Sequence, residues 1–107
     1  MESERRRWPR YPFVADAQVR ESVSSTVLRA RTSDLGANGC YVDTLNPLPP
    51  GSVITVQIDH EGQTFVAGGV VAHVQPNMGM GLTFIALEPG CASVLEAWLR
   101  EAGAVCK

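Results

Sequence analysis

Arginine residues are concentrated at the start of the chain. Four of the nine Lys and Arg residues lie within the stretch Arg5-Arg6-Arg7-Trp8-Pro9-Arg10. A guanidinium group is planar and permanently charged, so it can bind a phosphate through two parallel hydrogen bonds and can also stack on a flat ring. The stretch is therefore a candidate anion-binding arm. The alternative is a solvated tail, which is the usual fate of charged residues at a terminus.

A second cluster of polar and small residues follows at Asp34-Leu35-Gly36-Ala37-Asn38-Gly39. Asp, Asn and Gly favour turns, and glycine also lets a backbone amide approach a ligand closely. We expect a loop here. The Asp34 carboxylate could accept hydrogen bonds from the N–H groups of a ligand, although it could equally cap the turn without one.

The charge distribution limits the kind of anion. Residues 1–10 carry four arginines and two glutamates, a charge of +2, whereas residues 11–107 carry five basic and nine acidic side chains, a charge of −4. A basic arm on an acidic body with a pI near 5.6 is unlike a general DNA- or RNA-binding protein. Seven aromatic residues are also few for stacking successive bases. We therefore expect a small anion and no nucleic acid polymer.

The length and the cysteines indicate a cytoplasmic protein of one domain. A chain of 107 residues can bury one core. Its three cysteines, Cys40, Cys91 and Cys106, are odd in number and scattered, as expected for reduced thiols. No apolar run is long enough for a membrane span, and no apolar segment follows the charged N-terminus as a secretory signal would require.

The chain lacks the sequence patterns of an enzyme. It has no Gly-x-Ser-x-Gly elbow, no Walker phosphate-binding loop and no His-Glu-x-x-His helix. The two histidines and three cysteines do not have the spacing of metal ligands. We therefore expect no catalytic residue, no metal and no cofactor, and a binding module remains.

Alternating hydrophobic residues predict an all-β domain. Period-two alternation favours strands that bury one face. A pair of glycines, Gly68-Gly69, lies within one apolar run and predicts a bulge or a sharp coil of the strand, either of which helps to close a barrel. The predicted strands, joined by short turns, form a six-stranded antiparallel β-barrel; they cover residues 13–20, 26–33, 40–44, 54–58, 64–74 and 78–85.

The end of the chain changes to a helical period. Apolar residues recur three and four apart, which predicts one amphipathic helix over about residues 89–102. Pro89 suits its first turn and Gly103 its end, and Trp98 would anchor it on the barrel. The predicted organisation is a basic arm over residues 1–11 and a barrel with a C-terminal helix over residues 12–107.

These features together resemble the PilZ domain family. Its first motif, Arg-x-x-x-Arg before the first strand, is matched by Arg6 and Arg10. Its second motif, Asp/Asn-x-Ser-x-x-Gly, is matched by residues 34–39, with Gly36 in place of the serine. The flanking segments Tyr11-Pro12, Gly39-Cys40-Tyr41-Val42 and Met78-Gly79-Met80-Gly81-Leu82-Thr83-Phe84 are similar as well, so the resemblance covers nearly the whole chain.

The resemblance implies a receptor for the bacterial second messenger cyclic di-GMP, which orders the arm against the barrel and signals to an unidentified protein partner. Two phosphates and two guanine rings in this ligand match the chemistry of the arginines and of Asp34. In the family, an arginine at the position of Arg5 is associated with binding an intercalated dimer of the messenger. The implied ligand-binding residues are Arg5, Arg6, Arg10, Asp34, Gly36, Asn38 and Gly39.

The glycine at position 36 leaves a second hypothesis open. A missing serine hydroxyl would cost about 0.5–1.5 kcal/mol, a several-fold to about tenfold loss of affinity. The alternative is a degenerate PilZ domain that acts as a nucleotide-independent adaptor between proteins, for example in motility or pilus assembly. The retained arginines favour the receptor, and Gly36 favours the adaptor.

Overall fold

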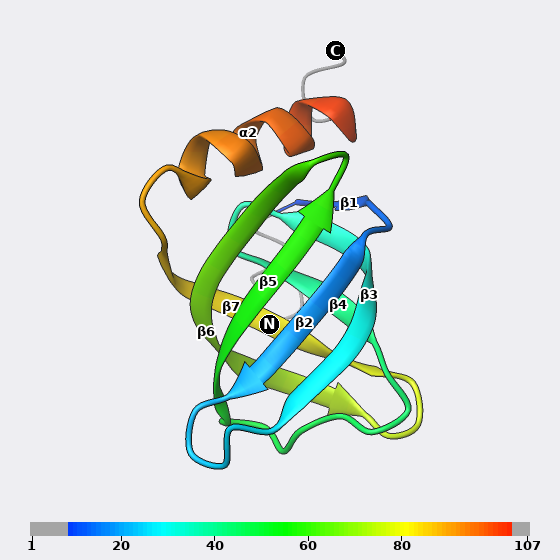
Figure 1. Cartoon of the computed structure of the whole chain (residues 1–107). Coiled ribbons are helices and arrows are strands. Elements are labelled where there is room, and N and C mark those ends of the chain that lie inside the picture. The colour runs from blue at the N-terminus through cyan, green and yellow to red at the C-terminus, as the bar shows by residue number, and fades with distance from the viewer. Residues whose placement is uncertain (1–8, 104–107) are drawn as a thin grey trace.

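The structure is a computed structural model that describes residues 9–103. It contains seven strands and one helix (Figure 1). These are β1 (Arg10–Pro12), β2 (Asp16–Glu21), β3 (Val27–Gly36), β4 (Gly39–Asp43), β5 (Val53–His60), β6 (Gln63–Gln75), β7 (Gly79–Leu87) and α2 (Cys91–Glu101).

Six of the strands form a closed antiparallel barrel. Their order is β3-β2-β5-β6-β7-β4, and the pairing of β3 with β4 closes the ring. The short strand β1 adds to β3 beyond the end of β2. The predicted fold, a six-stranded antiparallel barrel followed by one helix, is confirmed.

The alternation read from the sequence corresponds to the inside and outside of this barrel. Along β2, Ala17 and Val19 are buried and Asp16 and Arg20 are exposed. Inward side chains from all six strands make one core, which includes Leu35, Val42, Val56, Phe65 and Leu82. The prediction of half-buried strands is therefore confirmed by the packing.

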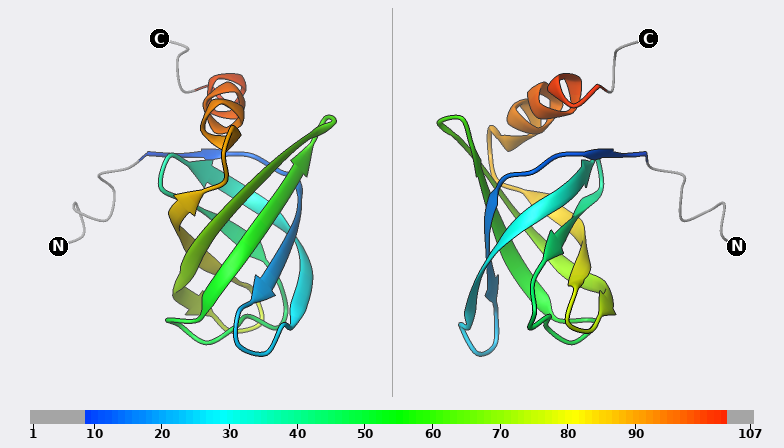
Figure 2. Two further views of the ribbon diagram at one scale, coloured as in Figure 1. Left: turned by 60° about the vertical axis from the view of Figure 1, so that its left-hand side comes forward. Right: turned by 90° about the vertical axis from the view of Figure 1, so that its right-hand side faces the viewer.

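The helix covers one end of the barrel, and β1 runs across the same end (Figures 1 and 2). Trp98 anchors the helix: it is 1% exposed and stacks on Phe13, with ring centroids 5.4 Å apart. Phe13 follows β1 directly. The hydrophobic core thus joins the arm side of the molecule to the helix.

The second motif does not lie in a loop. We expected a loop over residues 34–39, but β3 continues to Gly36 and only Ala37 and Asn38 lie between it and β4. The last residues of β3 are paired on both edges, Leu35 with Tyr11 of β1 and with Cys40 of β4. Backbone pairing on two sides therefore overrides the turn preference of Asp and Gly.

An irregularity is present at Gly68-Gly69, but the extra residue, Ile85, belongs to β7 and not to the strand that carries the glycines. The register between β6 and β7 shifts between these two residues. A Cβ atom on Gly69 would lie 2.2 Å from the carbonyl oxygen of Thr83, whereas one on Gly68 would meet nothing closer than 3.9 Å. Of the two, only Gly69 must be a glycine, because the backbone of β7 approaches it too closely for a Cβ atom.

Substitution of the two glycines should change the stability of the protein differently. Gly69→Ala should lower the free energy of unfolding by about 1–3 kcal/mol, because the methyl group forces β6 and β7 apart. Gly68→Ala, the matched control, should leave it unchanged or raise it by up to about 1 kcal/mol through a less flexible unfolded chain. Urea denaturation of both variants measures the difference, and equal effects would contradict the assignment.

Candidate functional site

The site is organised around one carboxylate oxygen. Oδ1 of Asp34 lies 2.8 Å from Nη1 of Arg10 and accepts a second hydrogen bond, of 3.0 Å, from the backbone N–H of Tyr41. The two charged side chains are 29% and 34% exposed. The carboxylate is therefore fixed by β1 on one side and β4 on the other, while part of it faces solvent.

A bulge in β3 turns Asp34 toward the outside. Thr32 pairs with Val42 and Asp34 pairs with Tyr41, so Ser33 is an extra residue with no partner on β4. Thr32 and Leu35 are both buried although they are three residues apart, which simple alternation does not allow. The extra residue reverses the alternation, so that Leu35 enters the core and Asp34 lies outside.

Two glycines make room for the Arg10 side chain. Gly36 pairs directly with Arg10, and a Cβ atom there would lie 2.6 Å from the carbonyl oxygen of Pro9 and 2.9 Å from Cδ of Arg10. A Cβ atom on Gly39 would lie 3.3 Å from Nη2 of Arg10 and 2.1 Å from the carbonyl oxygen of Leu82. The Arg10 side chain thus extends to Asp34 across the backbone of two glycines, where a larger residue would occupy its space.

The sequence-predicted residues are only partly covered by the structure. Arg10, Asp34, Gly36 and Gly39 are brought together, as the motifs imply. Asn38 lies exposed in the turn, where its backbone carbonyl accepts a hydrogen bond from Phe84. Arg5 and Arg6 lie outside the described residues.

The outer face beside Asp34 carries two aromatic rings that sequence reasoning did not assign to the site. The cross-strand partners run from Asp34 to Tyr41, from Tyr41 to Gly81 and from Gly81 to His73. The rings of Tyr41 and His73 are 6.1 Å apart at 35°. His73 is exposed on the barrel surface, and its place in this row depends on strand register.

Glycines also let these rings lie against the sheet. A Cβ atom on Gly79 would lie 2.6 Å from the Tyr41 ring, and one on Gly81 would lie 2.4 Å from the His73 ring. The Tyr41 hydroxyl donates a hydrogen bond to the side chain of Gln75. Partial burial, with Asp43 and Asp34 nearby, raises the pKa of Tyr41, so the phenol remains a donor at neutral pH.

Cys40 lies beneath the site and is not a nucleophile. It is fully buried, and burial raises its pKa to about 12, with Arg10 lowering the pKa and Asp34 raising it. The thiol is therefore neutral at physiological pH and packs as a small apolar side chain.

The polar residues thus form a surface on the barrel wall. A hollow of about 340 Å³ lies elsewhere, between β2, β3 and β5, and it is lined by residues other than Arg10 and Asp34. No helix among residues 9–103 is long and apolar enough to cross a membrane. What the surface offers is a guanidinium, a fixed carboxylate and two rings in a row.

Comparison with known proteins identifies the family. The PilZ domain family model matches residues 4–101, so the chain belongs to the PilZ domain family. This confirms the resemblance read from the two motifs. No curated protein matches the sequence of this chain.

Solved structures of similar fold agree. The PilZ domain with c-di-GMP of YcgR from Escherichia coli has a TM-score of 0.75 at 17% identity, over 95% of this chain and 94% of that one. The PilZ domain of CeSA from a cellulose-synthesizing bacterium has a TM-score of 0.64 at 14% identity, over 92% and 98%. The Bacillus subtilis inhibitor of motility (MotI/DgrA) has a TM-score of 0.72 at 20% identity; the match covers 91% of this chain but 50% of that one.

The shared acceptor on Asp34 makes a prediction about stability. Asp34→Ala should lower the free energy of unfolding by about 1–3 kcal/mol, because the Tyr41 N–H loses its acceptor. Asp34→Asn should cost less, because the amide oxygen can still accept that bond and only the partly exposed ion pair with Arg10 is lost, which is worth about 0–1 kcal/mol. Denaturant unfolding compares the two, and an equal loss in both would show that the backbone bond is unimportant.

Proposed function

We propose that this chain is a cyclic di-GMP receptor domain whose binding surface is built by Arg6 and Arg10 of the arm, by Asp34 and by the glycines at 36 and 39. The observation that carries the proposal is the hydrogen bonding of Asp34 to both Arg10 and the Tyr41 backbone. A cation and a carboxylate thus lie side by side, each partly exposed to solvent.

The remaining hydrogen-bonding capacity of the pair suits this ligand. A guanidinium has five N–H donors, and Arg10 uses Nη1 for Asp34, which leaves donors for a phosphate. Within the described part of the chain, both bonds to Asp34 are accepted by Oδ1. Oδ2 can then accept from the N–H groups on the Watson–Crick edge of a guanine.

The two rings beside the carboxylate suit the base. A guanine held by Asp34 would lie over the strands that carry Tyr41 and His73. Stacking of a base on an aromatic side chain is worth about 1–3 kcal/mol. We therefore add Tyr41 and His73 to the proposed ligand contacts. The two motifs do not include an aromatic residue.

Gly36 fits the proposal better than its departure from the motif suggests. A side chain at this position would press on Pro9 and on Arg10, the residue proposed to bind phosphate. In this chain, glycine thus accommodates the arginine, and the loss of a serine hydroxyl is offset by the position that Arg10 gains.

The wider proposal concerns signalling. Ligand binding would order Arg5 and Arg6 against the barrel, and the changed surface would be recognised by a protein partner in the cytoplasm. An intercalated dimer of the messenger is the form proposed to involve Arg5. PilZ domains are receptor or adaptor domains, so no enzymatic activity is proposed.

One observation favours the nucleotide-independent adaptor as a second candidate. Arg10 is paired with Asp34, and β1 is hydrogen-bonded to β3. An arm strand that is docked in this way could present a fixed surface to a protein. Binding of the messenger decides between the two functions.

Calorimetric titration of cyclic di-GMP into the protein is the decisive measurement. We expect micromolar or tighter binding, and a loss of about tenfold to a hundredfold for Arg6→Ala and for Arg10→Ala, since a charge-assisted hydrogen bond is worth about 1.5–3 kcal/mol. More than one messenger per protein would support the role of Arg5. His73→Ala in the same titration measures the contribution of its ring.

The matched control is Arg20→Ala. Arg20 is an exposed arginine near the turn between β2 and β3. If the site is local, the Arg20→Ala variant should bind cyclic di-GMP with the affinity of the unchanged protein. Absence of heat from a folded protein would reject the receptor and favour the adaptor. An equal loss in Arg20→Ala would indicate that only general positive charge matters.

Gly36 provides a separate prediction. Gly36→Ser and Gly36→Ala both add a Cβ atom, but only serine adds the hydroxyl of the family motif. We expect both to weaken cyclic di-GMP binding and to lower the melting temperature, because β1 must shift away from β3. Calorimetry and thermal denaturation test this, and tighter binding by Gly36→Ser would show that the hydroxyl outweighs the clash.

A further inference from the structure

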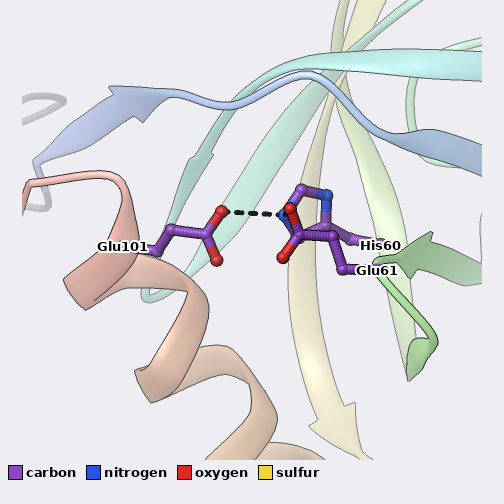
Figure 3. A group of neighbouring side chains, drawn as sticks. All are labelled: His60, Glu61 and Glu101. Atoms are coloured by element: carbon purple, nitrogen blue, oxygen red, sulfur yellow. Dashed lines mark hydrogen bonds and ion pairs between the residues drawn. The ribbon is translucent and has the colours of Figure 1, made fainter.

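Three possible metal ligands meet at the end of the barrel that α2 covers (Figure 3). His60 is the last residue of β5, Glu61 begins the turn to β6, and Glu101 is the last residue of α2. Nε2 of His60 lies 2.9 Å from Oε2 of Glu101 and 3.8 Å from Oε2 of Glu61. One ligand atom from each residue lies within 4.8 Å of the others.

The imidazole is held rigidly by its neighbours. Its side chain is 18% exposed, and its ring centroid lies 4.6 Å from that of Phe13 and 5.6 Å from that of Trp98. These two rings restrict the plane of the His60 ring. In that orientation Nε2 points toward the carboxylate of Glu101 (Figure 3). A pre-oriented imidazole loses little conformational freedom when it binds a metal ion.

The two carboxylates are able to adjust. Glu61 and Glu101 have side chains that are 74% and 48% exposed. Glu61 has a left-handed backbone with φ of 49°, followed by Gly62 with φ of 82°, as a two-residue hairpin turn requires. The turn therefore fixes where Glu61 leaves the backbone, beside His60, while its side chain remains free to rotate.

We propose that His60, Glu61 and Glu101 form a Zn²⁺ site with one imidazole and two carboxylate ligands and with water in the fourth position. Zn–N and Zn–O distances of about 2.0–2.2 Å place tetrahedral ligand atoms about 3.4 Å apart. Separations of 2.9 Å and 3.8 Å reach this value through small rotations of exposed side chains.

The donor set and its charge suit a transition-metal ion such as Zn²⁺ better than Mg²⁺ or Ca²⁺. An imidazole suits Zn²⁺, whereas Mg²⁺ and Ca²⁺ prefer sites made entirely of oxygen. Two carboxylates and a neutral imidazole carry a charge of −2, which one Zn²⁺ balances. Within residues 9–103, the basic nitrogen within 4.0 Å of each of these two carboxylates is Nε2 of His60, and not that of a Lys or Arg that would compete with a metal ion.

The site would connect two parts of the fold that are distant in sequence. Glu101 ends α2, and His60 and Glu61 belong to the hairpin of β5 and β6. A bound ion would therefore fasten the helix over the end of the barrel. The metal-site proposal does not rest on the proposed messenger-binding function.

The test must distinguish a metal site from a simple hydrogen bond between His60 and Glu101. Glu61 allows the two cases to be distinguished. Its side chain is 74% exposed and its contact with His60 is 3.8 Å long, so it adds little to the stability of the metal-free protein. Glu61→Gln should leave the melting temperature of the metal-free protein unchanged but weaken Zn²⁺ binding by about tenfold or more, at least the loss seen when a supporting residue around a zinc ion is changed. Glu101→Gln should lower both the melting temperature of the metal-free protein and its affinity for Zn²⁺.

The experiment is calorimetric titration of ZnCl₂ into tag-free protein stripped with a chelator, in a Cys106→Ser background so that this thiol does not bind the metal; Cys40 and Cys91 are buried. Glu96→Gln is the matched control, since Glu96 is exposed on the same helix. One Zn²⁺ per chain with micromolar affinity, a rise in melting temperature and losses confined to Glu61→Gln and Glu101→Gln would support the site. No binding, or binding that Glu61→Gln leaves unchanged, would overturn it.

Discussion

The pairing of β3 with β4 is the constraint on which the rest of the molecule depends. It closes the barrel, and its bulge at Ser33 decides which side chains of β3 face the core. With the bulge, Leu35 is buried and Asp34 faces out, where the Tyr41 N–H and Arg10 can reach it. Without the bulge, a charged carboxylate would point into a core of aliphatic side chains, at a cost of several kcal/mol.

Glycines complete the surface that the bulge creates. On the arm side, Gly36 and Gly39 leave space over the backbone for Arg10. On the other side, Gly79 and Gly81 do the same for the rings of Tyr41 and His73. The same device, a side chain of one strand lying over a glycine of the next, thus extends the surface in both directions from Asp34.

Much of the fold could be predicted from local patterns, but the site depends on pairings that these patterns do not contain. Alternation along β2 and the helical period ending at Ala102 are local, and both correspond to the observed elements. The end of β3 was expected to be a loop because Asp34 and Gly36 favour turns, yet strands on both edges keep it extended. The row from Asp34 to His73 depends on the register of four strands, and register is set by contacts between residues far apart in sequence.

The segment from Arg10 to Phe13 connects the surface around Asp34 with the helix α2. Arg10 is bound to Asp34 on the barrel wall, and three residues later Phe13 stacks on Trp98 of α2 and lies against His60. The carbonyl of Phe13 is also held by the hydroxyl of buried Thr32, at 2.6 Å. Because Phe13 is fixed in this way, a ligand that drew Arg10 from Asp34 would meet resistance within one short strand. If β1 did move, Phe13 would transmit the displacement to the Trp98 ring and so to the helix. The surface proposed to bind the messenger and the helix that covers the barrel are therefore joined by packed side chains rather than by a flexible linker.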